Sequence, residues 1–199
     1  MSTIEHAPES HHLAPGVVAD QQRRVVLFLI LADAIFFACM LFSYFYLRAL
    51  NVHGGWLPEG VNTAPSWQIW LITAVTVASA CAYRSAEMGI RAEQRVRFQT
   101  GSLLAIALMI VSIALVIYQA NTWGILMSDG SYASMFIVMT GVQLVHLVVV
   151  LILGIGIWNR GNQGKLDNGN VTHATVVGYF WYWVTLTGVL AACTSFVVQ

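Results

Sequence analysis

The stretch Val25–Tyr46, VVLFLILADAIFFACMLFSYFY, decides the fold of this chain. It contains a single charged side chain, that of Asp33. About 20 predominantly apolar residues in a helix are enough to cross the hydrocarbon core of a bilayer. A carboxylic acid inside such a segment is costly, so Asp33 is the first residue that needs an explanation.

Four further stretches pass the same length test, over residues 67–83, 101–120, 135–158 and 174–198. All four prolines of the chain lie outside these five spans, so we expect unbroken helices. The sequence therefore predicts an all-α membrane protein that forms a bundle of five transmembrane helices. We expect one domain over residues 23–199, preceded by a polar, mobile N-terminal tail over residues 1–22.

The overall composition fits this class. Of 199 residues, 58% are hydrophobic and 9% are charged, and the formal net charge is zero. A neutral chain has no bulk attraction to nucleic acid, which we therefore exclude as a partner. The three cysteines lack the paired spacing of a zinc or iron–sulfur site, so no metal site is expected in this chain.

The positions of arginine and lysine predict the orientation in the membrane. Basic residues cluster before the first span, between the second and third, and between the fourth and fifth, whereas the other connections hold only Arg48. Cytoplasmic loops carry the excess of basic residues. We therefore expect a cytoplasmic N-terminus and an outside C-terminus. The basic residues concerned are Arg23, Arg24, Arg84, Arg91, Arg95, Arg97, Arg160 and Lys165.

Depth in the membrane brings a few polar residues to one level. Asp33 lies roughly 12 Å from the cytoplasmic end of its span, at a rise of about 1.5 Å per residue. Gln143 and His146 lie three residues apart on one face of the oppositely directed fourth span. Thr185 in the fifth span reaches a similar level. These four residues form the candidate polar cluster of the bundle.

Asp33 allows two interpretations. It is either a proton-exchanging or partner-recognising carboxylate, or a neutral, hydrogen-bonded acid that ties helices together. We favour the second, because a proton relay needs several titrating groups in series and few exist here. His146 is likewise better explained as a hydrogen-bonded histidine of the bundle than as a haem ligand, because no second deep histidine is available.

Several motifs resemble subunit III of the haem–copper terminal oxidases. Residues 29–37, LILADAIFF, are similar to the segment in which a buried acid precedes an apolar-aromatic run in that family. Residues 56–60, WLPEG, resemble its short loop before the next helix. Residues 128–134, SDGSYAS, lead into Thr140, Gly141 and His146 as at the entry to its histidine-bearing helix. Residues 179–183, YFWYW, resemble the start of its last helix.

The chain departs from the family pattern at three places. A family glutamate that follows a glutamine is here Thr122, after Gln119. The first of two histidines is here Gln143, beside His146. A histidine and an aspartate of the last helix are here Tyr182 and Thr185. Each exchange removes a titrating group and keeps the capacity for hydrogen bonding.

The resemblance implies a non-catalytic accessory subunit in the short, five-helix bacterial form, at the bacterial cytoplasmic membrane. It would pack beside subunits I and II, which would hold the haem and copper. It would bind phospholipid and support sustained oxygen reduction and proton uptake. This chain would contain no cofactor, and Asp33 would occupy the family's buried-carboxylate position. The resemblance leaves open whether the electron donor is cytochrome c or quinol.

Two alternatives remain open on the residues alone. One is an accessory subunit of a nitric oxide reductase complex. The other is a small membrane transporter, although the polar residues that would recur along a water-lined path, or a broken helix, do not occur.

Overall fold

The computed structural model of the chain describes residues 15–51, 55–164, 166 and 171–197. These residues form five long α-helices and one short 3-10 helix, with no β-strand among them. All five α-helices are long and apolar enough to cross a membrane. The prediction of an all-α protein with five membrane helices is therefore confirmed. In chain order the elements are α1 (Pro15–Leu50), α2 (Ser66–Arg91), α3 (Arg95–Trp123), η1 (Met127–Asp129), α4 (Ser131–Asn162) and α5 (Val171–Val197).

Most helices extend beyond the apolar stretch that predicted them. Helix α1 begins at Pro15, so residues 15–22 of the expected polar tail are helical. Proline is favoured at the start of a helix, where its missing N–H is not needed. Hydropathy marks the part of a helix inside the hydrocarbon, whereas the hydrogen-bonded backbone continues into the interface. Residues 1–14, His53 and Lys165 lie outside the described residues, and the orientation of the termini stays a prediction.

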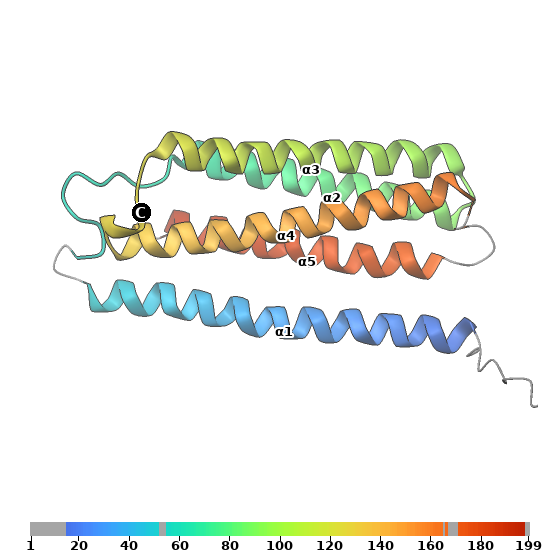
Figure 1. Cartoon of the computed structure of the whole chain (residues 1–199), viewed down its shortest axis with the longest axis horizontal. Coiled ribbons are helices and arrows are strands. Elements are labelled where there is room, and N and C mark those ends of the chain that lie inside the picture. Colours follow the sequence, from blue (N-terminus) through green and yellow to red (C-terminus); the bar gives the residue numbers. More distant parts are fainter. Residues whose placement is uncertain (1–14, 52–54, 165, 167–170, 198–199) are drawn as a thin grey trace, which may run out of the picture.

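Helices α2 to α5 form a closed bundle, and α1 lies along one side of it (Figure 1). Each helix of the bundle contacts two others in the order α2, α3, α4, α5 and back to α2. Among the described helices, α1 contacts only α4 and α5. Only 6% of the most apolar stretch of α1 is buried. Helix α1 is therefore the least embedded of the five long helices.

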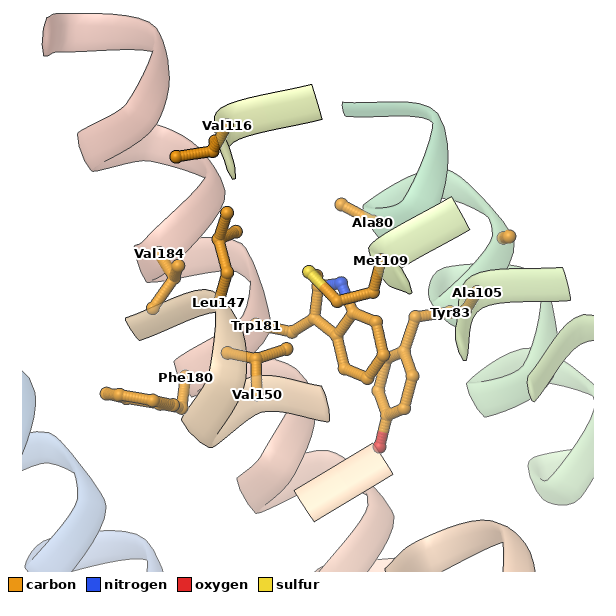
Figure 2. Packing of buried hydrophobic residues seen from close by; sticks show 11 residues of the cluster. Ala80, Tyr83, Ala105, Met109, Val116, Leu147, Val150, Phe180, Trp181 and Val184 are labelled. Carbon is orange, nitrogen blue, oxygen red and sulfur yellow. The ribbon is translucent and has the colours of Figure 1, made fainter. Parts of the chain in front are cut away.

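The centre of the bundle is built around Trp181, which is fully buried on α5. Its ring stacks on Tyr83 of α2, with ring centroids 4.5 Å apart and planes 19° from parallel. Figure 2 shows this pair beside Met109 of α3 and Val150 of α4. On the α4 side, a Cβ added at Gly154 would lie only 2.7 Å from Trp181 Cζ3. The indole ring therefore fills a space that four helices share.

Helices α2 and α3 approach closely over small residues. A Cβ added at Gly101 would lie 2.9 Å from the backbone nitrogen of Ala86. Ala105 is fully buried, and its carbonyl oxygen accepts a 2.8 Å hydrogen bond from Ser79 Oγ. Small residues allow membrane helices to pack by direct backbone contact, which replaces the missing hydrophobic drive between helices in lipid.

Candidate functional site

Asp33 joins α1 to both neighbouring helices. Its Oδ1 lies 2.9 Å from Nε2 of His146 on α4. Its Oδ2 accepts a 2.6 Å hydrogen bond from the indole Nε1 of Trp183 on α5. The side chains of Asp33 and His146 are only 17% and 18% exposed. Each carboxyl oxygen therefore has a partner on another helix, and together they hold α1 against α4 and α5. We call Asp33, His146 and Trp183 the anchor triad.

The hydrogen bonds of His146 show how a proton is shared between His146 and Asp33. Nδ1 of His146 lies 2.8 Å from the carbonyl oxygen of Val142, which can only accept, so Nδ1 carries a proton. If the imidazole is neutral, Nε2 is an acceptor and Asp33 donates to it as a carboxylic acid. If Nε2 is also protonated, an imidazolium faces a carboxylate. In both forms the Asp33–His146 pair shares one proton and has no net charge, which suits a site within the membrane.

Gln143 lies one turn before His146 on α4 and makes different contacts. Its Nε2 donates a 3.1 Å hydrogen bond to the carbonyl oxygen of Val184, and its Oε1 lies 3.4 Å from Thr187 Oγ1. Gln143, Asp33 and His146 all line a small cavity of about 10 Å³ between α1, α4 and α5. The structure therefore brings these three predicted residues together, although Gln143 does not bond to the pair.

Thr185 does not join the anchor triad. Its hydroxyl donates a 2.9 Å hydrogen bond to the carbonyl oxygen of Trp181, one turn earlier on α5. Its side chain lines a different cavity, among helices α2 to α5. The α5 residue that reaches Asp33 is Trp183. Successive residues of a helix are about 100° apart, so Trp183 and Thr185 lie on opposite faces of α5.

A fully paired and buried acid, Glu87, lies near the end of α2 and was not expected from the sequence. It is 3% exposed. Oε2 of Glu87 lies 2.9 Å from Arg84 Nη1, and Oε1 lies 2.6 Å from Arg91 Nη2. From α5, Tyr182 Oη donates to Oε2 at 2.9 Å and Thr175 Oγ1 donates to Oε1 at 3.3 Å. Glu87 therefore ties α2 to α5, as Asp33 ties α1 to α4 and α5.

The charge pattern of the sequence contains the signal for this site. Arg84 and Arg91 are three residues before and four residues after Glu87, which are the spacings of ion pairs along a helix. The expected second span ended at Tyr83, so these charges appeared to lie in a loop. Tyr182, one of the predicted substitutions in the family pattern, contacts Glu87 and not the anchor triad.

Thr122 lies away from both sites. It is exposed near the end of α3, and its hydroxyl donates a 2.8 Å hydrogen bond to the carbonyl oxygen of Tyr118. Across residues 15–51, 55–164, 166 and 171–197, no group of three or more His, Cys, Asp or Glu side chains could hold a metal ion.

A model of one protein family matches most of this chain. The family is described as cytochrome c oxidase subunit III, and the match covers residues 5–190. The chain belongs to this family. The resemblance inferred from the sequence motifs is therefore confirmed.

Relatives within the subunit III family come from bacteria and eukaryotes. The "Cytochrome c oxidase subunit 3" of Chondrus crispus is 26% identical over 179 residues, 88% of this chain and 64% of that relative. The "Probable cytochrome c oxidase subunit 3" of Nocardia farcinica is 26% identical over 174 residues, 84% of this chain and 83% of that relative. The subunit of Corynebacterium diphtheriae is 23% identical over 173 residues. The chain thus spans less than two thirds of the first relative and most of the second.

Two motifs that carried the subunit III resemblance lie against each other in space. Gly130, from the stretch before α4, has φ = +121°, and a Cβ added there would lie 2.7 Å from Cδ of Pro58. The backbone N–H of Tyr132 donates a 3.1 Å hydrogen bond to the carbonyl oxygen of Trp56. The Trp56 ring packs edge-on against Tyr44 of α1, with centroids 5.0 Å apart. These contacts fix the end of α1 to the start of α4.

Proposed function

We propose that this chain is a non-catalytic accessory subunit of a respiratory haem–copper oxidase of the bacterial cytoplasmic membrane, with its N-terminus in the cytoplasm. It packs beside catalytic subunit I, binds phospholipid, and supports sustained oxygen reduction and proton uptake. Haem and copper belong to the partner subunits I and II. The match of residues 5–190 to the subunit III family carries this proposal.

The polar groups of the membrane interior support a structural role. The carboxyl oxygens of Asp33 and of Glu87 are bonded to side chains of this same chain. Each acid joins helices that are distant in sequence. Such hydrogen bonds and ion pairs within the chain suit a subunit whose role is to keep a fixed structure beside a catalytic partner.

The outward face of α1 supports a role in contact with lipid or a partner. Large apolar side chains remain exposed along most of its length, including Phe28, Leu31, Ile35 and Phe42. Exposed apolar area of this extent is stable only in lipid or against another apolar surface. The proposal places this face toward lipid and subunit I.

A groove between α1 and the α4–α5 pair supports the binding of a phospholipid. Its volume is about 590 Å³. Apolar residues of α1, α4 and α5 form most of its wall, including Val25, Ile152 and Val177. Arg160 also lines the groove and is exposed in α4. An arginine above an apolar groove matches a phosphate headgroup with acyl chains below it.

Purification of the tagged chain in a mild detergent tests the accessory role. We expect haem-containing catalytic subunits to co-purify, and we expect an oxidase core prepared without this chain to lose activity sooner during turnover. The readouts are the haem absorption spectrum and the time course of oxygen consumption. A chain that purifies alone and supports substrate flux in liposomes would contradict the proposal.

The phospholipid groove is tested by a glycine substitution. A Cβ added at Gly156 meets no atom within 4 Å, so Gly156→Leu fills the groove without a steric clash in the bundle. We expect this variant, and Arg160→Gln, to lower the phospholipid-to-protein ratio of the purified complex, measured by native mass spectrometry. Gly141→Leu is the matched control, because Gly141 is equally open on α4 and does not line the groove. Equal loss in all three variants would exclude this groove as the binding site.

A further inference from the structure

A cavity of about 70 Å³ lies among helices α2, α3, α4 and α5. It extends from Ile69, near the start of α2, to Leu147, near the middle of α4. Most of its wall is apolar, but Gln119, Gln143 and several hydroxyl groups also line it. None of its lining residues is charged.

Gln119 of α3 contributes a buried donor without a protein partner. The residue is 3% exposed and lines the cavity. Among the described residues, none accepts a hydrogen bond from its Nε2. A buried amide N–H without an acceptor is costly, and native proteins normally pair such groups with protein or with bound water.

The hydroxyl groups around the cavity present the complementary chemistry. Thr73 donates to the carbonyl oxygen of Ile69 at 2.8 Å, and Ser195 donates to that of Ala191 at 2.9 Å. Each hydroxyl has one proton, so these oxygens remain available only as acceptors. A ligand that accepts a hydrogen bond from Gln119 Nε2 and donates to the oxygens of these hydroxyls would therefore suit the cavity.

We propose that this cavity is a binding site for internal water molecules, centred on the side-chain amide of Gln119. Water both accepts and donates, is uncharged, and needs about 10–15 Å³ of such space per molecule. An ion would lack a countercharge in this wall, and an apolar occupant would leave Gln119 Nε2 unpaired. This inference concerns the interior of the chain and does not depend on the proposed oxidase role.

Gln143 separates this site from the anchor triad together with Met139 and Ala191, because these three residues line both cavities. Oε1 of Gln143 is weakly bonded, since the hydroxyl of Thr187 lies closer to the carbonyl oxygen of Val184, at 2.9 Å, than to Oε1, at 3.4 Å. The cavity beside Asp33 and His146, at about 10 Å³, is at the lower limit for a single water molecule, whereas the cavity beside Gln119, at about 70 Å³, has room for several. The proposed water molecules therefore contact Gln143 from the bundle side.

Radiolytic labelling with mass spectrometry tests the site in the full chain or its complex. Hydroxyl radicals formed from bound water oxidise neighbouring side chains, even buried ones. Met139 lines the cavity and is 7% exposed, whereas Met109 is fully buried in the apolar core and does not line it. We expect Met139 to be oxidised several-fold faster than Met109, and Gln119→Leu to remove most of this difference. Gln99→Leu, an exposed glutamine of the same helix, is the control and should preserve it.

Two results would overturn the proposal. One is equal oxidation of Met139 and Met109 in the unmodified protein, which would indicate a dry cavity. The other is rapid oxidation of Met139 that persists in Gln119→Leu, which would indicate water from another source. A density map of the unmodified complex needs no substitution and tests the same point. It should contain a peak within hydrogen-bond distance of Gln119 Nε2, and featureless or continuous acyl-chain density there would contradict the proposal.

Discussion

Replacing Asp33 by leucine is expected to release α1 from the bundle, whereas replacing it by asparagine is expected to leave the fold nearly intact. Leucine removes the acceptor of Trp183 and the partner of His146, and the loss should be about 1–3 kcal/mol in the free energy of unfolding. An asparagine presents an oxygen to Trp183 and an N–H to His146 Nε2, as a protonated acid does. Denaturation with sodium dodecyl sulfate, followed by circular dichroism, measures the difference.

The control for this pair is Asp20→Leu, which removes an exposed acid of the same helix. It should leave the unfolding midpoint unchanged. If Asp33→Asn lost as much stability as Asp33→Leu, Asp33 would have to be an ionised carboxylate that the amide cannot replace. If neither variant changed stability or assembly, Asp33 would not be the anchor of α1.

The replacement of Glu87 by leucine is expected to separate the ends of α2 and α5. It removes the acceptor of Tyr182 Oη and of Thr175 Oγ1, both of which bond to a buried charged group. Hydrogen bonds to charged groups contribute about 1.5–3 kcal/mol each, so a loss of about 3 kcal/mol is expected. Thermal unfolding of the detergent-solubilised protein measures it. Glu87→Gln keeps a carbonyl oxygen for one of these two donors and should lose about half as much.

The matched control is Glu59→Gln, because Glu59 is exposed in the connection between α1 and α2. Its unfolding temperature should equal that of the unmodified chain. A loss in Glu87→Leu no greater than in this control would mean that the carboxylate does not hold α2 to α5. Arg84 and Arg91 are both about half exposed, so water can solvate them when Glu87 is absent.

The sequence predicted the five helices because each apolar stretch is long enough to cross a bilayer. It also predicted that Asp33 and His146 could lie together, because the rise of about 1.5 Å per residue places both at a similar depth in two oppositely directed helices. Depth does not determine which face of a helix points inward, so Thr185 was placed in the cluster and Trp183 was overlooked. An indole counts as apolar in a hydropathy profile, although its N–H is a strong donor.

Glu87 was missed for a different physical reason. Its stretch of α2 is interrupted by Arg84 and Arg91, so the mean hydropathy falls before the helix ends. The arginines lower the hydropathy of the segment. They also offset the cost of burying Glu87, because their positive charges pair with its carboxylate along the same helix. A hydropathy profile therefore shows the lower hydropathy of this segment but not the ion pairs that allow Glu87 to be buried.

The contacts of α1 have a consequence for the order of assembly during synthesis. Helix α1 precedes α2 and α3 in the chain, yet the helices that it touches, α4 and α5, follow them. The contacts of α1 with these two helices can therefore form only after α4 and α5 have been synthesised. The long apolar stretch of α1 is suited to the hydrocarbon of the bilayer during this interval. The docking of α1 is thus a late step of synthesis, although α1 itself is made before the helices that receive it.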